Sequence, residues 1–311
     1  MVTNRSYNND YENIIQFLEE AHKENNNQNC WLPQKWEYTE YMVDKLNQER
    51  KGAISWHTNI RIWEEDNKIV ALAHTESDDN IYIDIKTEYE YLYSEILNWC
   101  ENNISDKKRI NVFALESLKY QEEELTQRGY KKEMSILEDN DVGEYQNYQY
   151  TKDKIYETNL SNDFEFVCYY DVKNDCERQY AIHKGFHPTD EFPAPQTYII
   201  PFLNMEKAPM FNGNLEIMIK DINKNKYVGM IIFWYNKETN TALLEPLSVH
   251  PEYQGKTLGY NLVQEGLKKL KNMKVDKVYV ESFNSNRKSF YNKCGFITYD
   301  CAWKWIKEVD E

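Results

Sequence analysis

Hydrophobic residues along the chain follow two spacings, one typical of helices and one typical of strands. Apolar residues that recur every three or four positions lie on one face of a helix. Apolar residues that alternate with polar ones, or that form short runs, indicate strands. The predicted helices cover residues 9–23, 34–49, 88–101, a stretch ending at 125, 162–185, 196–204, 260–271 and 287–293. The predicted strands cover residues 60–63, 69–74, 81–85, 110–115, 154–160, 215–219, 226–234, 243–249, 277–282 and 296–306.

The order of these elements in the second half of the chain repeats the order in the first. Gly295-Phe296 can be aligned with Gly129-Tyr130, which places residues 278–282 on residues 112–116. We therefore predict an α+β fold in which one unit occurs twice, each copy a central mixed β-sheet flanked by helices. The predicted domains are residues 1–145 and 146–311. Coincidence between two unrelated α+β domains is the alternative.

Composition excludes some functions but selects none. The chain of 311 residues is 41% hydrophobic, enough for two cores, and carries a formal net charge of −15. This charge argues against nucleic acid or an anionic membrane as the main partner. It permits a cationic amine substrate, although it can equally serve solubility alone. The six cysteines form no CxxC pair, and no signal peptide or run of about 18 apolar residues occurs, so we expect a reduced, cytoplasmic protein.

The most informative stretch runs from Leu243 to Gly259 and reads LLEPLSVHPEYQGKTLG. Its apolar first part predicts a buried strand, which His250-Pro251 ends because proline disfavours a continuing ladder. The turn 254–259 then leads directly into the predicted helix 260–271. The first turn of a helix presents unpaired N–H groups and the positive end of the helix dipole. The stretch therefore predicts an anion-binding turn.

Two spaced motifs resemble those of the GNAT superfamily of acyl-CoA-dependent N-acyltransferases. The family's Gln/Arg-x-x-Gly-x-Gly/Ala signature corresponds to residues 254–259, after the typical segment 249–253. Its later Asn-x-x-Ala-x-x-x-Tyr-x-x-x-Gly-Phe element corresponds to Asn284, Arg287 in place of alanine, Tyr291 and Gly295-Phe296. The resemblance is strong over residues 215–305. In the first half it concerns element order only, and we expect a tandem GNAT protein.

The resemblance implies that acetyl-CoA is the co-substrate. Backbone groups of residues 247–249 would pair with the pantetheine amides, and N–H groups of residues 255–260 would bind the pyrophosphate. Thr257 departs from the family, which usually has its first glycine there; the threonine side chain restricts close approach, although its hydroxyl can itself donate to phosphate. The predicted cofactor-binding residues are Leu247, Ser248, Val249, Gln254, Gly255, Lys256, Thr257, Leu258, Gly259, Tyr260, Asn284 and Tyr291.

Direct attack of an amine on a thioester needs a base for the ammonium proton and an acid for the departing thiolate. Tyr291 stands where family members often place the acid; packing of its ring beside Phe290 is the alternative. Glu245 lies on the motif strand and faces the same side as Leu247, so it can act as the base, directly or through water. It can also be a surface carboxylate at a strand end. A strand N–H near Leu247 would stabilise the oxyanion.

The first half lacks these features. Residues 86–90, which correspond to the phosphate turn, contain no glycine and two carboxylates, and Leu125 stands at the position of Tyr291. We therefore predict that the first half has lost cofactor binding and serves as a scaffold or a substrate wall.

Three further features are weaker signals. His183 and His187 have metal-like spacing, but the glycine and proline nearby favour a loop, and no metal is expected. The segment 187–204 contains Asp190 and Glu191 and is interpreted as a substrate-gating loop that can select a cationic acceptor. Cys294 is interpreted as a packed thiol, since no histidine is placed beside it in sequence.

The sequence thus predicts an N-acetyltransferase acting on a primary amine of a small molecule or peptide. A non-catalytic CoA-binding regulatory module and a structural, partner-binding tandem protein remain as alternatives. A mycothiol-synthase-like activity also uses tandem GNAT domains, but no residue here points to a thiol-precursor substrate.

Overall fold

The computed structural model describes residues 1–24, 31–76, 80–103, 109–133, 141–150, 155–173, 176–189 and 196–308. For residues 141–150, 176, 180, 181, 196, 198 and 283–285 it describes the backbone alone. Below, the N-terminal half means residues 1–133 and the C-terminal half means residues 141–308. Every helix in the described part of the chain is too short or too polar to cross a lipid bilayer.

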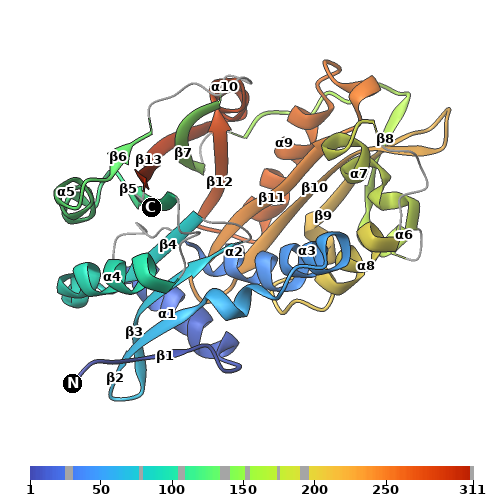
Figure 1. Cartoon of the computed structure of the whole chain (residues 1–311). Helices are drawn as coiled ribbons and strands as arrows, with labels where there is room; N and C mark the ends of the chain where they lie inside the picture. The colour runs from blue at the N-terminus through green and yellow to red at the C-terminus, as the bar shows by residue number, and fades with distance from the viewer. Residues whose placement is uncertain are drawn as a thin grey trace.

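The two halves contain similar elements in the same order, as the sequence predicts (Figure 1). The N-terminal half contains β1 (Thr3–Ser6), α1 (Tyr11–Glu24), α2 (Pro33–Tyr38), α3 (Asp44–Lys51), β2 (Arg61–Glu65), β3 (Lys68–Thr75), β4 (Asn80–Ile85), α4 (Tyr93–Asn103), β5 (Arg109–Leu115), α5 (Lys119–Gln127) and β6 (Lys131–Lys132). A π-helical turn, Thr39–Val43, joins α2 to α3.

After β7 (Asp141–Tyr150), the C-terminal half continues with β8 (Phe164–Cys168), α6 (Tyr169–Val172), α7 (Tyr180–Phe186), α8 (Gln196–Met205), β9 (Glu216–Asp221), β10 (Lys226–Asn236), β11 (Thr241–Val249), α9 (Leu258–Asn272), β12 (Lys277–Asn284), α10 (Ser285–Lys293) and β13 (Phe296–Glu308). In each half one parallel strand pair, β4–β5 or β11–β12, interrupts an antiparallel sheet. The predicted α+β class with a mixed sheet in each unit is confirmed.

The chain crosses between the two sheets at β7 and again at the end of β13. β7 follows β6 in the chain but lies in the C-terminal sheet, between β12 and β13. The end of β13, residues 302–308, lies in the N-terminal sheet and pairs with β5, while Trp305 and Ile306 also pair with β6. A single sheet of 13 strands results. The predicted division at residues 145 and 146 falls inside β7, so neither predicted domain contains all the strands of its own sheet.

Two predicted elements are wrong. Residues 162–185 do not form one helix: β8 pairs with β9 at the sheet edge, and shorter helices follow. The alternation of Phe164, Phe166 and Cys168, which suits a strand, outweighs the helix-cap pattern at Asn162-Asp163. Residues 155–160 are not a strand either. Side-chain amides of α9 hold this segment instead, since Asn261 Oδ1 accepts from the Asn159 N–H at 2.8 Å. The sequence prediction also omits β1, β6 and β7.

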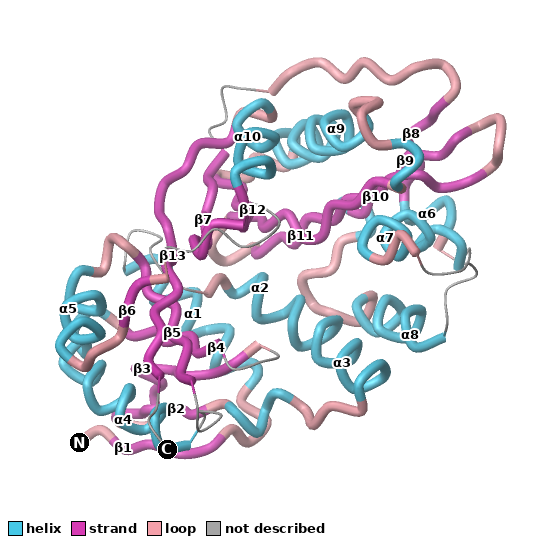
Figure 2. The backbone as a smooth tube through the Cα atoms, turned by 45° about the horizontal axis from the view of Figure 1, so that its top comes forward, coloured by secondary structure: helices cyan, strands magenta, loops and turns pink. Residues whose placement is uncertain are grey.

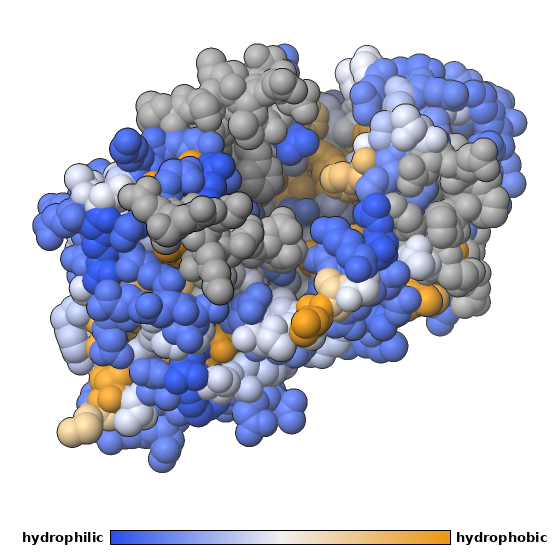
Figure 3. Space-filling view, viewed as in Figure 1, coloured by the Kyte–Doolittle hydropathy of each residue, from blue (hydrophilic) through white to orange (hydrophobic). Residues whose placement is uncertain are grey.

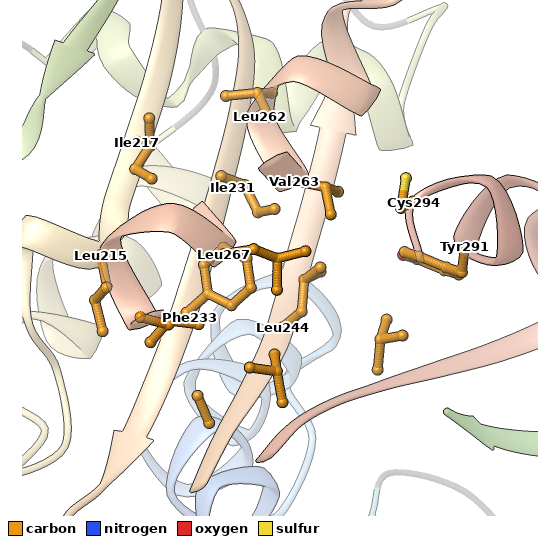
Figure 4. Close-up of a cluster of buried hydrophobic side chains, with 14 of the residues drawn as sticks. Leu215, Ile217, Ile231, Phe233, Leu244, Leu262, Val263, Leu267, Tyr291 and Cys294 are labelled. Atoms are coloured by element: carbon orange, nitrogen blue, oxygen red, sulfur yellow. The ribbon is translucent and has the colours of Figure 1, made fainter. Parts of the chain in front are cut away.

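The C-terminal sheet is covered on both faces, and the N-terminal half provides part of one cover. Neighbouring residues of β11 point to opposite faces. Leu244 belongs to the core under α9, together with Leu262 and Leu267 (Figure 4). Leu243 belongs to a second core, which combines side chains from α7 and α8 with Met42 of the N-terminal half. Figure 2 shows α3 and α8 side by side at this seam. The halves therefore share a hydrophobic core.

Candidate active site

The site begins where two parallel strands separate. β11 and β12 pair only from Thr241 to Leu243 and from Lys277 to Tyr279, although the described backbone of both strands continues further. Figure 1 shows them diverging toward α9 and α10. Beyond the last pair, β11 backbone groups on that side are available to a ligand.

A bulge in β11 lies at the point of separation. In the pairing with β10, Phe233 faces Leu244 and Ile231 faces Leu247, so Glu245 and Pro246 together lie opposite one residue. Pro246 has no N–H to donate to the ladder. The indole N–H of Trp234 donates to the Glu245 carbonyl at 2.7 Å and holds the bulge in place. A bulge re-aims the side chain that it carries, here the carboxylate of Glu245.

The turn after β11 has the geometry expected of an anion site. Gly255 and Thr257 adopt left-handed backbone conformations, with φ of 77° and 60°. The first hydrogen bond of α9 runs from the Asn261 N–H to the Thr257 carbonyl at 3.0 Å. The N–H groups of residues 258–260 therefore precede the helical ladder and point toward the turn. They lie at the positive end of the α9 dipole.

Thr257 explains why the related motif has glycine at this position. A left-handed conformation costs a β-branched residue about 1–2 kcal/mol relative to its right-handed form, and glycine avoids that cost. The Thr257 hydroxyl donates to the Lys256 carbonyl at 2.6 Å. That proton is thus used within the turn, so the hydroxyl is not poised to donate to a phosphate.

A groove of about 650 Å³ runs along this turn. Figure 3 shows hydrophobic side chains at the bottom of a hollow in the same region. Eight of the predicted cofactor-binding residues line the groove: Leu247, Val249, Gln254, Gly255, Thr257, Leu258, Gly259 and Tyr260. Phe290 and Lys293 of α10 also line it and were not predicted. The sequence could have indicated both residues, because they lie within two positions of the predicted Tyr291.

The remaining predicted binding residues lie elsewhere. The Lys256 ammonium lies 4.9 Å from the centre of the Tyr253 ring, beside a neighbouring cavity. Ser248 is outside the groove but lines the second cavity described below, where it is packed so tightly against Gly185 of α7 that a Cβ on Gly185 would overlap the Ser248 hydroxyl. Asn284 ends β12, and its side chain lies outside the described residues.

A second cavity of about 280 Å³, which we call the reaction chamber, joins the groove through shared walls at Leu247, Val249 and Gln254. Both predicted catalytic residues, Glu245 and Tyr291, line this chamber. The fold therefore brings together two side chains that are 46 positions apart in sequence. It also brings in Glu281 and Arg287. The sequence analysis did not identify Glu281. It could have done so, because Glu281 is a carboxylate within a mostly apolar strand, as Glu245 is.

Glu245 is suited to exchange a proton near neutral pH. Burial raises the pKa of its carboxyl to about 7, with Glu76 adding to the rise and Lys35 and Arg287 opposing it. A base with a pKa near the working pH combines a useful ionised fraction with adequate basicity.

A lysine of the N-terminal half forms an ion pair with a carboxylate that lines the reaction chamber. The Lys35 ammonium, on α2, lies 2.7 Å from Glu281 of β12, and both side chains are buried. Lys35 also lies 4.9 Å from the centre of the Trp31 ring. Sequence reasoning had no signal for Lys35, because the contact joins residues 246 positions apart.

Tyr291 packs in the core and also reaches the reaction chamber, so its position fits both the packing role and the role of the acid. Its ring packs against Phe290 and Phe296, with centroids 5.2 and 5.7 Å away, and its side chain also lines the reaction chamber. Cys294 directly follows the last residue of α10 and is fully buried (Figure 4). Burial raises the pKa of its thiol to about 12, so the thiol stays protonated, as expected of a packed cysteine.

The weaker candidates do not gather into a metal site. The rings of His183 and His187 lie with centroids 5.5 Å apart. Among the described residues, no group of three or more metal-ligating side chains occurs. Asp190 and Glu191, assigned to a substrate-gating loop, lie outside the described residues, whereas the end of that segment forms α8.

Comparison with known proteins identifies one family profile and several similar folds. Residues 177–296 match the profile of the Acetyltransferase (GNAT) family. Among solved structures, a GCN5-related N-acetyltransferase from Sphaerobacter thermophilus has a TM-score of 0.63 at 12% identity, covering 100% of this chain and 96% of that one. A tandem GNAT protein from the clavulanic acid biosynthesis pathway also has a TM-score of 0.63, at 11% identity, covering 100% of this chain and 99% of that one. No curated protein sequence matches. At these identities the structural likeness concerns the fold.

Proposed function

We propose that the protein transfers the acetyl group of acetyl-CoA to a primary amine of a small molecule or peptide, as the match of residues 177–296 to the profile of the GNAT acetyltransferase family suggests. One observation carries the proposal: the chamber that contains Glu245 and Tyr291 shares its walls with the groove along the phosphate-type turn. An anion site alone would be compatible with many ligands. An anion site that continues into a chamber with a base and an acid supports acyl transfer.

Each part of the site has a distinct task in this proposal. The N–H groups of residues 258–260 bind the pyrophosphate, and the separated backbone of β11 pairs with the pantetheine amides. Glu245 accepts the proton of the substrate ammonium, so that a neutral amine attacks the thioester carbonyl. The attack forms the N–C bond and a tetrahedral oxyanion, which a β11 N–H near Leu247 stabilises. When the oxyanion collapses, the C–S bond breaks, Tyr291 donates its proton to the departing thiolate, and the proton released by the nitrogen returns Tyr291 to its neutral form.

The test is thiol release from acetyl-CoA in the presence of a panel of primary amines. We expect amine-dependent thiol release, and an increase in melting temperature when CoA is added, because a ligand of the native state stabilises it. Tyr291→Phe should lower kcat by about 10²- to 10⁴-fold and leave the CoA-induced shift intact. Tyr235→Phe is the matched control, since its hydroxyl contacts Asn240 at 3.1 Å, outside the site. It should change neither quantity.

The alternatives give different results in the same experiment. Tight CoA binding without turnover of any amine would indicate a regulatory CoA-binding module and contradict the proposal. No effect of CoA on the melting temperature would indicate a structural or partner-binding protein.

A further inference from the structure

A third cavity, of about 270 Å³, lies at the seam between the two halves, and we call it the seam pocket. Its walls come from both halves of the chain. The N-terminal half contributes Tyr38, Met42 and Leu46, and α7 and α8 contribute Ile182, Phe186 and Phe202. We propose that the acceptor is a primary amine with an apolar aryl or alkyl substituent, and that this substituent binds in the seam pocket. The inference rests on the proposed function and specifies its substrate class.

The seam pocket is continuous with the reaction chamber. Glu245 and Phe186 line both cavities. The chamber in turn shares Leu247 with the groove along the turn. An amine placed for attack beside Glu245 therefore has the thioester on one side and the seam pocket on the other. Whatever the amine carries on its carbon is directed toward the seam pocket.

The lining determines the chemistry of that substituent. Apolar side chains form most of the wall, which also includes His183, His187 and, at the junction with the chamber, the carboxylate of Glu245. A second cationic group of the substrate would lose its hydration there, while Glu245, the carboxylate in this lining, is already used by the reacting ammonium. Apolar cavities of about 150 Å³ are large enough to hold benzene, so a pocket of this size accommodates a phenyl ring with a short chain. Each methylene group buried should raise kcat/KM about fourfold.

Hydrogen bonds across the seam hold the walls in place. The Asn204 side chain of α8 donates to the Tyr41 carbonyl at 2.7 Å. The Gln34 side chain of α2 donates to the Thr241 carbonyl at 2.9 Å, at the start of β11. These bonds fasten the N-terminal half to α8 and to β11, the strand that carries Glu245. The N-terminal half thereby acts as the substrate wall that the sequence suggests, and it does so through its helices.

The experiment compares amines of increasing apolar size with acetyl-CoA: ethylamine, butylamine and phenethylamine, with putrescine as a charged analogue of butylamine. We expect kcat/KM to rise at least tenfold from ethylamine to butylamine and to be highest for phenethylamine. The kcat/KM for putrescine should be lower than that for butylamine. Equal kcat/KM values across the series, or a preference for putrescine, would overturn the inference.

A pair of matched variants tests the location. Leu46→Trp fills the seam pocket, whereas Leu203→Trp places the same side chain on α8 at a position that is 43% exposed and outside the pocket lining. Leu46→Trp should lower kcat/KM for phenethylamine at least tenfold and leave ethylamine within twofold. Leu203→Trp should change neither. An equal loss for both amines in Leu46→Trp would contradict the location, provided that melting temperatures show both variants folded.

Failure of the inference can be separated from failure of the proposed function. If no amine is acetylated, the proposed function is wrong, and the pocket is then tested by calorimetric binding of phenethylamine to the CoA-loaded protein. Binding that Leu46→Trp abolishes would still support the pocket, and no binding would exclude it. If all amines are acetylated equally, the proposed function holds and the substrate class is wrong.

Discussion

The two halves of this protein share one order of elements, yet they differ where the parallel strand of each ends. In the C-terminal half, β11 leads into a turn with left-handed residues and then the N-terminus of α9. In the N-terminal half, β4 leads directly into a 3₁₀ helix, Thr87–Leu92. There the Lys86 N–H is bonded to the Val70 carbonyl at 3.0 Å, so the backbone stays attached to the sheet. The two sheets keep the same order of strands, while the turn that we propose as an anion site follows β11 and has no counterpart after β4.

The strands themselves carry equivalent carboxylates with different surroundings. Equivalent positions follow from the parallel pairs of the two sheets, Ile81–Val112 and Ala242–Val278. Three residues further along each strand lie Asp84 and Glu245. Glu245 lines a cavity, whereas Asp84 is buried and accepts the Trp31 N–H at 3.3 Å.

Aromatic packing occupies the region next to Asp84. Trp31, Trp36, Trp56 and Tyr82 surround the buried His74, and burial together with the Lys35 charge lowers the pKa of that histidine to about 3. A neutral histidine among tryptophans belongs to a core. The comparison shows that the shared fold tolerates either a packed interior or a reaction chamber at this place, depending on which side chains fill it.

The largest effect should come from removing the crossing of β13 into the N-terminal sheet. Truncation after Cys301 removes the part of β13 that lies between β5 and β6, together with Trp305, which is buried in the N-terminal core. Loss of a buried tryptophan alone costs about 3–5 kcal/mol, so we expect the N-terminal half to unfold at 25 °C. Thermal unfolding followed by circular dichroism measures this, with truncation after Glu308 as the control. Cooperative folding of isolated residues 1–145 would show that the crossing is dispensable.

The next effect concerns the two equivalent carboxylates. Glu245→Gln should lower kcat by about 10²- to 10⁴-fold, because the amide cannot accept the ammonium proton. Since the carboxyl pKa is raised to about 7, wild-type activity should fall as pH decreases below 7, where the base becomes protonated. That limb of the pH profile should be absent in Glu245→Gln. Asp84→Asn, at the equivalent place, should leave both rate and profile unchanged. A pH limb near 7 that persists in Glu245→Gln would exclude Glu245 as the base.

The next effect, of intermediate size, is the loss of stability when either of two ion pairs formed by lysines is broken. Lys35→Met leaves Glu281 buried without its partner and should reduce the free energy of unfolding by about 3–5 kcal/mol. Lys86 pairs with Glu20 at 2.6 Å, but the Glu20 side chain is 42% exposed, so Lys86→Met should cost about 0–1 kcal/mol. Urea unfolding measures both. Similar losses in the two variants would show that burial does not decide the strength of the Lys35 pair.

The smallest effect concerns the turn. Thr257→Gly should raise the free energy of unfolding by about 0.5–1 kcal/mol, since relief of the left-handed strain exceeds the backbone entropy cost of glycine. The Thr257 hydroxyl caps no backbone N–H of α9, so the substitution removes only its bond to the Lys256 carbonyl and a long one, 3.4 Å, from the Asn261 side chain. CoA should also bind more tightly. Thr87→Gly, at the start of the 3₁₀ helix in the N-terminal half, should bring no gain. A destabilised Thr257→Gly would show that the threonine is compatible with this backbone.

The sequence by itself determined the features that depend on neighbouring residues. Alternating and helical spacings locate most of the strands and helices, and Gly255 followed by a helix start locates the turn. Tyr291 was predicted from the resemblance to the GNAT motif and Glu245 from its position two residues before Leu247 on the motif strand, and the structure places both beside one cavity. Such signals are local, and a turn or a helix cap needs only a few consecutive residues to form.

Only the tertiary structure decided which segments meet across the seam. Residues 164–168 became a strand because β9 offered an edge to pair with, and β7 and β13 crossed between the sheets through pairings that leave no local trace. Lys35 reached Glu281 from the other half of the chain in the same way. Contacts of this kind depend on burial and on distant partners, and the hydrophobic pattern says that a face is buried without saying against what.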